Sequence, residues 1–174
     1  MQKFCVIGAL IVAAATGCSK KSMKSGTSLN ATDQQFITSA SFNNVDEIDA
    51  GNLASTNAAD SGLKAFGTLM VNDYGHAQSA LVLFADNAGF TVLSSPDSVH
   101  QQELAALQNL TGVAFDTTYL RLQINDDQAA ITLYQAEQTN AQSAAVKDYI
   151  NMYLPAIQAH LTAADSLIKT WVGH

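Results

Sequence analysis

The chain has few basic residues, and their positions argue against a nucleic-acid partner. Lysine and arginine total 8 against 15 aspartate and glutamate residues, which gives a net charge of −7. Half of these basic residues, Lys3, Lys20, Lys21 and Lys24, lie near the N-terminus. Because nucleic acids are bound through clustered lysine and arginine side chains, we expect no nucleic-acid binding.

Cysteine is also scarce. Cys5 and Cys18 are the two cysteines, and no cysteine follows them. The rest of the chain therefore offers no thiol for a disulfide or a zinc–cysteine site. It also has no glycine-rich phosphate loop and no Gly-x-Ser-x-Gly motif. These absences favour a non-catalytic protein.

Signals for β-strands are missing as well. Almost no segment alternates apolar and polar residues with a period of two, and runs of β-branched residues are rare. Proline occurs only at Pro96 and Pro155. We therefore expect an all-α protein.

The N-terminus has the features of a secretory leader. An uncharged run from Phe4 to Ala15 follows Lys3 and ends in small residues before Cys18. Such a run is typical of a signal peptide and is too short to span a bilayer as a helix. The alternatives are an ordinary cleaved signal and a lipoprotein signal, and the sequence Ala15-Thr16-Gly17-Cys18 resembles a bacterial lipobox.

The lipobox predicts three parts of the chain and a location. Residues 1–17 would be the signal peptide, 18–30 the acylated Cys18 with a polar tether, and 31–174 the folded domain. Several acyl chains on Cys18 would give stable anchoring to a membrane. We expect a lipid-anchored protein of the bacterial cell envelope, at the outer membrane facing the periplasm, with an envelope protein as a possible but unspecified partner.

The folded domain is predicted to contain four long helices. A capping-box pattern of Thr32 and Gln35 begins the first, which continues for about 25 residues. Three more helices and a short one have the approximate bounds 62–86, 98–110, 114–138 and 143–171, the last of them kinked or restarted at Pro155. The short helix, 98–110, lies in a long crossover connection. This arrangement matches a ferritin-like four-helix bundle.

The apolar stripes of these helices are interrupted by polar residues near mid-height. On the second helix the predicted stripe passes through Leu63, Met70, Asp73 and Phe84, with His76 beside it. The interruptions across the four helices are Glu47, Asp73 with His76, Asp126 with Asp127, and His160.

Two interpretations of these polar residues remain open. Glu47, Asp73, His76, Asp126 and His160 could form a carboxylate and imidazole site for Fe, Mn or Zn. Alternatively, they form a polar layer held by hydrogen bonds or water, which specifies the register of the helices. His100 and His174 are interpreted as surface residues without a role.

Several short motifs also occur in the order and spacing of a known family. They are Asp33-Gln-Gln-Phe36, Glu47-Ile48 with Gly51-x-Leu53-Ala54, Phe66 with Met70-Val71-x-Asp73, Phe115-Asp116-x-x-Tyr119, and Leu154-Pro155 with His160-Leu161. On these motifs residues 31–170 resemble the bacterial domain of unknown function 4142. The resemblance implies a ferritin-like bundle in an outer-membrane or periplasmic protein, often a lipoprotein, and no established activity.

The family pattern resembles Asp-His in the second and third long helices. Here those positions read Asp73-Tyr74 and Asp126-Asp127, and His160 alone is in register. Our first functional hypothesis is therefore a non-catalytic, envelope-anchored binding or structural bundle. The alternative is a ferritin-like metal protein with storage, sensing or oxidase-like chemistry.

Overall fold

The structure is a computed structural model that describes residues 28–92, 95 and 97–172. Within these residues it contains five helices and no strand, which confirms the predicted all-α class. Their bounds are α1 Ala31–Asn57, α2 Ser61–Asn87, α3 Ser98–Gln108, α4 Gly112–Asn140 and α5 Ala144–Val172. The predicted signal peptide, Cys18 and most of the tether lie outside the described residues.

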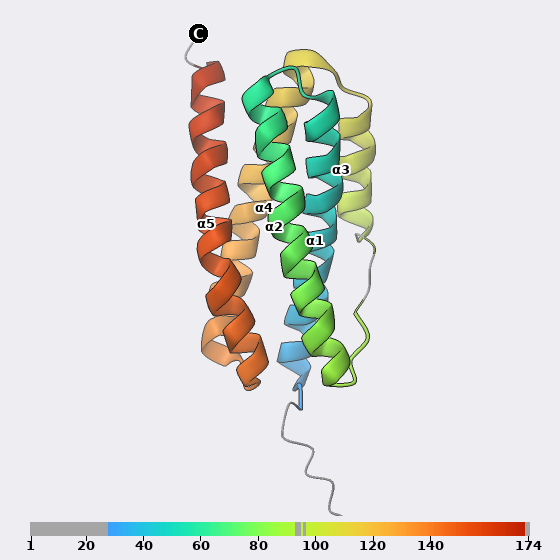
Figure 1. Ribbon diagram of the computed structural model, residues 1–174, viewed down its shortest axis with the longest axis vertical. Coiled ribbons are helices and arrows are strands. Elements are labelled where there is room, and N and C mark those ends of the chain that lie inside the picture. The colour runs from blue at the N-terminus through green and yellow to red at the C-terminus, as the bar shows by residue number, and fades with distance from the viewer. Residues whose placement is uncertain (1–27, 93–94, 96, 173–174) are drawn as a thin grey trace, which may run out of the picture.

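The four long helices form an elongated bundle with one long connection (Figure 1). Helices α1 and α2 are antiparallel, and so are α4 and α5. The connection after α2 returns along the outside of the bundle and carries α3, so that α2 and α4 run in the same direction. A single long crossover is the connectivity of ferritin-like bundles. In the part of the chain that the structure describes, no helix is long and apolar enough to cross a bilayer.

Helix α1 begins at a different cap from the one predicted. Asn30 is the N-cap, and its side chain accepts a hydrogen bond of 2.8 Å from the Asp33 N–H. The Asp33 carboxylate in turn accepts one of 3.0 Å from the Asn30 N–H. The prediction of a Thr32–Gln35 box was therefore wrong. Asparagine is among the best N-cap residues, and the reciprocal pair with Asp33 satisfies two donors at once.

The core-facing side of α2 agrees with the predicted stripe in part. Leu63 and Met70 are buried as predicted. At Asp73 and Phe84, which are half-buried, the buried position lies one residue further along the chain, at Tyr74 and Ala85. Tyr74, rather than Asp73, faces the interior.

Helix α5 continues through Pro155 as one helix, so the predicted restart does not occur. Proline lacks the N–H that would bond to the preceding turn. The Pro155 side chain is exposed, while its neighbours Leu154 and Ile157 are buried. Helix packing on both sides of the proline therefore holds the helix together.

A buried carboxylate fixes the connection between α1 and α2. Asp116, near the start of α4, accepts hydrogen bonds of 2.9 and 3.0 Å from the backbone N–H groups of Ala59 and Asp60. Asp60 is itself the N-cap of α2. The Asp116 side chain thus connects the start of α4 to the turn between α1 and α2.

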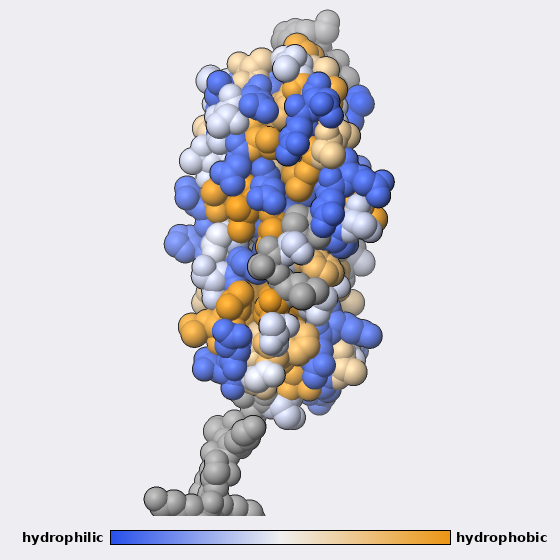
Figure 2. Space-filling model, turned by 90° about the vertical axis from the view of Figure 1, so that its right-hand side faces the viewer, coloured by the Kyte–Doolittle hydropathy of each residue, from blue (hydrophilic) through white to orange (hydrophobic). Residues whose placement is uncertain are grey.

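Hydrophilic and hydrophobic residues are interspersed on the face that carries α3 and the crossover. Figure 2 shows this face, where small orange groups lie between blue ones.

Candidate metal centre

A crevice of about 270 Å³ lies between α1, the start of α3 and the middle of α4. Polar side chains line one part of it, and apolar ones line the rest. The lining residues are Ser39, Phe42, Asn43, Asp97, His100, Asp126, Ala129, Ala130 and Leu133. At the edge of this crevice lies the one group of described residues in which ligand atoms of a histidine and two carboxylates come within 4.8 Å of one another.

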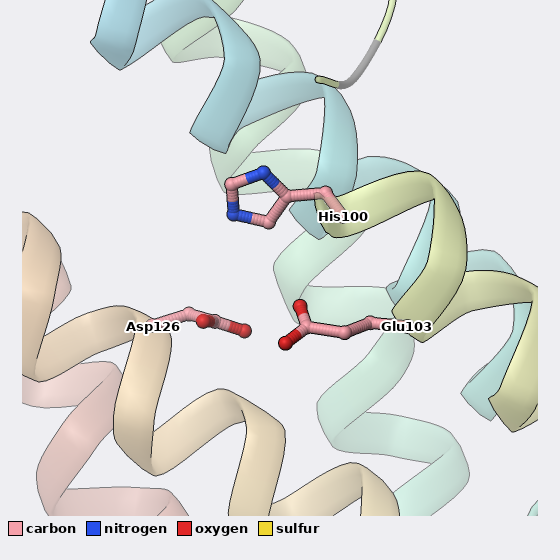
Figure 3. A group of neighbouring side chains, drawn as sticks. All are labelled: His100, Glu103 and Asp126. Carbon is pink, nitrogen blue, oxygen red and sulfur yellow. The ribbon is translucent and has the colours of Figure 1, made fainter. Parts of the chain in front are cut away.

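The three gathered side chains are His100, Glu103 and Asp126, each half-buried. His100 and Glu103 are three residues apart on α3, a spacing that puts both on one face of a helix. Asp126 comes from α4. Figure 3 shows the three side chains pointing toward one another across the gap between the two helices. One imidazole and two carboxylates are a ligand set that divalent metals bind.

Asp97 holds the His100 ring from behind. It is the N-cap of α3, and its Oδ1 accepts hydrogen bonds from the backbone N–H groups of Val99 and His100. The same oxygen lies 2.9 Å from His100 Nδ1. With Nδ1 engaged, Nε2 is the ring nitrogen left for a ligand. Histidines that bind metals commonly donate their other N–H to a carboxylate in this way.

Carboxyl groups in and near the crevice have raised pKa values. Burial raises the pKa of Asp126 to about 6, with Glu103 adding to the rise and His100 opposing it. Burial also raises the pKa of Asp46, on α1, to about 7. The pKa of His100 is raised because Asp46 and Asp97 together outweigh the opposing effect of burial. A bound cation would stabilise all of these carboxylates in their charged form.

No lysine or arginine side chain supplies that positive charge within the described residues. The lysine and arginine side chains of the described residues are all exposed. These residues are Lys64, Arg121, Lys147 and Lys169. The two ion pairs found there both use histidine, His100 with Asp97 and His160 with Asp73.

Glu47 lies in the interior, behind the crevice. It is fully buried, and the Gln123 amide donates a hydrogen bond of 2.5 Å to its Oε2. Asp127 is buried beside it and accepts a hydrogen bond of 2.9 Å from the Tyr74 hydroxyl. Burial, followed by the nearby Asp127, raises the pKa of Glu47 well above its usual value. Glu47, Gln123, Asp127 and Tyr74 thus form an interior polar layer that joins α1, α2 and α4.

Asp73 and His160 form a separate pair between α2 and α5. His160 Nε2 lies 2.9 Å from Asp73 Oδ2, and the two side chains are 5% and 38% exposed, in that order. His76, one turn beyond Asp73, is exposed. The predicted stripe included Asp73 and placed His76 beside it, and Asp73 is the less exposed of the two.

The five predicted metal ligands are thus divided among four places. Glu47 is in the interior, Asp126 faces the crevice, and Asp73 pairs with His160 while His76 faces solvent. Residues at the same height along a bundle can point in different directions. Equal height alone therefore does not bring their side chains together.

His100 and Glu103 were not predicted as metal ligands from the sequence. His100 was predicted to be a surface residue without a role, and the structure places it in the crevice. The signal that could have found them is His-x-x-Glu just after the Pro96-Asp97 start of α3. The sequence predicts a short helix at 98–110, but periodicity does not predict which residues this helix contacts.

The fold and this cluster define an all-α bundle with a candidate imidazole and carboxylate metal site. Residues 18–167 match the family described as a domain of unknown function, DUF4142, and the chain belongs to that family. A search of curated proteins found no match.

Solved structures of CopM share the fold. CopM in the Cu(I)-bound form has a TM-score of 0.69 and 19% identity, covering 82% of this chain and 99% of that chain. The Cu(II)-bound form has a TM-score of 0.69 and 18% identity, covering 79% and 96%. The Ag-bound form, obtained by co-crystallization, has a TM-score of 0.67 and 18% identity over the same shares.

Proposed function

We propose that the chain is a non-catalytic metal-binding bundle that holds a divalent cation in the crevice through His100, Glu103 and Asp126. The observation that carries the proposal is the meeting of three ligand atoms within 4.8 Å from two helices. The bond between Asp97 and His100 Nδ1 supports it, since it orients the imidazole.

The ligand types favour some ions over others. Imidazole suits Zn²⁺ and Cu²⁺, and carboxylates also accept Mn²⁺. Cu⁺ and Ag⁺ prefer thiolate and thioether sulfur, which this cluster does not contain. Stability of divalent complexes generally rises along the series to Cu²⁺ and then falls at Zn²⁺. We therefore expect Cu²⁺ to bind most tightly, Zn²⁺ less tightly and Mn²⁺ weakly.

The likeness to CopM supports a metal-binding role in a general way. Structures of CopM hold copper in two oxidation states and silver. A bundle of this architecture can therefore contain metal ions. The choice of site in this chain depends on its own residues.

Calorimetric titration of the untagged chain tests the proposal. We expect one Cu²⁺ or Zn²⁺ per chain at the crevice, and a loss of at least about tenfold in affinity in the variant His100→Ala. His76→Ala is the matched control, because it removes an exposed histidine on α2 and should leave the affinity unchanged.

Two outcomes would contradict the site. Equal affinities of the wild type and His100→Ala would show that the ion binds elsewhere. A loss in His76→Ala would indicate adventitious binding to surface histidine. Circular dichroism of each variant confirms that the helices are intact.

We also propose that Cys18 anchors this bundle in the cell envelope. Support comes from the lipobox-like sequence that ends at Cys18 and from the polar segment that follows it. The variant Cys18→Ser should lose labelling by a radioactive fatty acid and move from the membrane to the soluble fraction. Membrane association of an unlabelled wild-type chain would contradict an acyl anchor.

A further inference from the structure

The interior layer behind the crevice contains polar atoms without hydrogen-bond partners. Four of them lie on buried side chains of α1 and α4, and each has almost no exposed surface. They are Glu47 Oε1, Asp127 Oδ2, Gln123 Oε1 and the Tyr119 hydroxyl. Buried polar groups in proteins are nearly always hydrogen-bonded, so a group of four without partners calls for an explanation.

These four side chains belong to one layer. The Gln123 amide donates to Glu47, which places its own Oε1 beside that carboxylate. Asp127 is close enough to raise the pKa of Glu47, and both acids raise the pKa of the Tyr119 hydroxyl after burial, its main cause. The layer therefore joins two carboxylates, an amide oxygen and a hydroxyl.

No lysine, arginine or histidine of the described residues forms an ion pair with the carboxyl groups of this layer. Two buried carboxylates are costly to ionise unless a cation balances them. Among the described residues every lysine and arginine is exposed, and the two histidines with carboxylate partners are paired with Asp97 and Asp73 rather than with Glu47 or Asp127. Something else must supply positive charge or protons to the layer.

We infer that Glu47, Asp127 and the Gln123 carbonyl oxygen form an internal site for an oxygen-seeking divalent cation, with the Tyr119 hydroxyl as a further oxygen beside it. The available atoms are all oxygens, which suit Mn²⁺, Mg²⁺ and Ca²⁺ rather than copper. The site is separate from the crevice and does not depend on the proposed function.

The sequence around the layer explains how two sites can lie back to back. On α1, Asp46 interacts with the crevice histidine while Glu47 is buried in the interior. On α4, Asp126 faces the crevice and Asp127 the interior. Each helix thus supplies one acid to each side.

Thermal unfolding with Mn²⁺ as the probe tests the inference. Each protein is refolded with and without Mn²⁺, so that slow entry into the interior cannot hide binding. At about a hundredfold excess over the dissociation constant, the midpoint of the wild type should rise by about 5 °C or more. The double variant His100→Ala with Glu103→Gln should keep this rise, because it alters only the crevice.

Variants that replace a carboxyl group of the layer by an amide should show no rise of the midpoint with Mn²⁺. Glu47→Gln and Asp127→Asn, each introduced into the crevice double variant, should fold, since each replaces a buried carboxyl group by an amide of similar size, and each should abolish the rise with Mn²⁺. A rise that persists in both variants, or that disappears in the crevice double variant, would overturn the inference. So would the absence of any rise in the refolded wild type, which would leave protons or water as the partners of these atoms.

Discussion

Adjacent acidic residues on one helix face different surroundings in this protein. Asp126 interacts with Glu103 and His100 in the crevice, whereas Asp127 is buried and bound by Tyr74. Successive residues of a helix point about 100° apart, so two consecutive acids can serve two sides of one interface. Two neighbouring residues of α4 therefore belong to different surroundings, Asp126 to the crevice and Asp127 to the interior.

Asp97 is predicted to act as a positioning residue for His100. The variant Asp97→Ala removes the acceptor of Nδ1 and should weaken divalent-ion binding by about tenfold or more. It also removes the N-cap of α3, at a cost of about 1 kcal/mol in stability. Calorimetric titration measures the first effect, and urea unfolding measures the second.

A conservative variant provides the control for this prediction. Asp97→Asn keeps a side-chain oxygen that can accept from the backbone N–H groups and from His100 Nδ1. This variant should therefore retain most of the ion affinity and of the stability. If Asp97→Ala binds the ion as tightly as the wild type, the imidazole needs no support from Asp97.

The sequence could identify part of the polar interior and one residue of the crevice, Asp126. Glu47 and His160 were predicted to interrupt apolar stripes, and both are buried. His100 was not predicted to belong to a site, because the packing of α3 against α4 depends on the path of the crossover. The connection between a residue of α3 and Asp126 is a tertiary contact, which helical periodicity does not encode.

At the scale of the helices, α1 and α2 pack closely through two glycines. A Cβ atom added to Gly67 would lie 2.7 Å from the Gly51 carbonyl oxygen and 2.8 Å from the Ala54 Cβ. Backbone atoms on both sides cannot move aside easily. By helix propensity alone Gly51 would weaken the first helix, but it is required for this contact.

The variant Gly67→Ala should therefore destabilise the bundle despite the higher helix propensity of alanine. Overpacking of this kind costs about 1–3 kcal/mol, and chemical denaturation measures it. Gly75→Ala on the same helix is the matched control.

An added Cβ at Gly75 would meet nothing within 4 Å, so alanine there should be neutral or stabilising by up to about 1 kcal/mol. Equal effects of Gly67→Ala and Gly75→Ala would show that the close approach of α1 and α2 does not limit packing.

The helices themselves were largely predictable, and their rotations were predictable only in part. The predicted second helix, 62–86, differs from α2 by one residue at each end. Its buried face was predicted correctly at Leu63 and Met70 but displaced by one residue at Asp73 and Phe84, because apolar residues also occur beside the stripe. A broad apolar surface leaves the facing direction to the neighbouring helices.

At the scale of the whole molecule, the topology followed from helix lengths and one long connection. Four long periodic segments with few prolines leave little choice other than a bundle, and the long gap between Asn87 and Gly112 allows a crossover. The chain therefore specifies its architecture strongly, whereas the ions it binds depend on a few polar side chains.

The free energy of unfolding of the metal-free protein should fall between about pH 4 and pH 7. Burial raises the pKa values of Asp46 and Asp127 from 3.8 to about 7, so that the folded chain holds more protons than the unfolded chain in this range. Stability then decreases as pH rises, by up to about 1.4 kcal/mol per unit of pKa difference for each group. The pKa of Asp97, which is lowered, has the opposite effect on the pH dependence of stability.

Urea unfolding at several pH values measures this dependence. A saturating divalent ion should reduce the decrease, because it stabilises the ionised carboxylates. A free energy of unfolding that stays constant or rises from pH 4 to pH 7 in the metal-free protein would contradict the raised pKa values.

The most direct test of the central claim is an anomalous diffraction map of crystals grown with Cu²⁺ or Zn²⁺. We predict a peak in the crevice within bonding distance of His100 Nε2 and of carboxylate oxygens of Glu103 and Asp126, and its loss in His100→Ala crystals. A peak at Asp73 and His160 with none in the crevice would contradict the account.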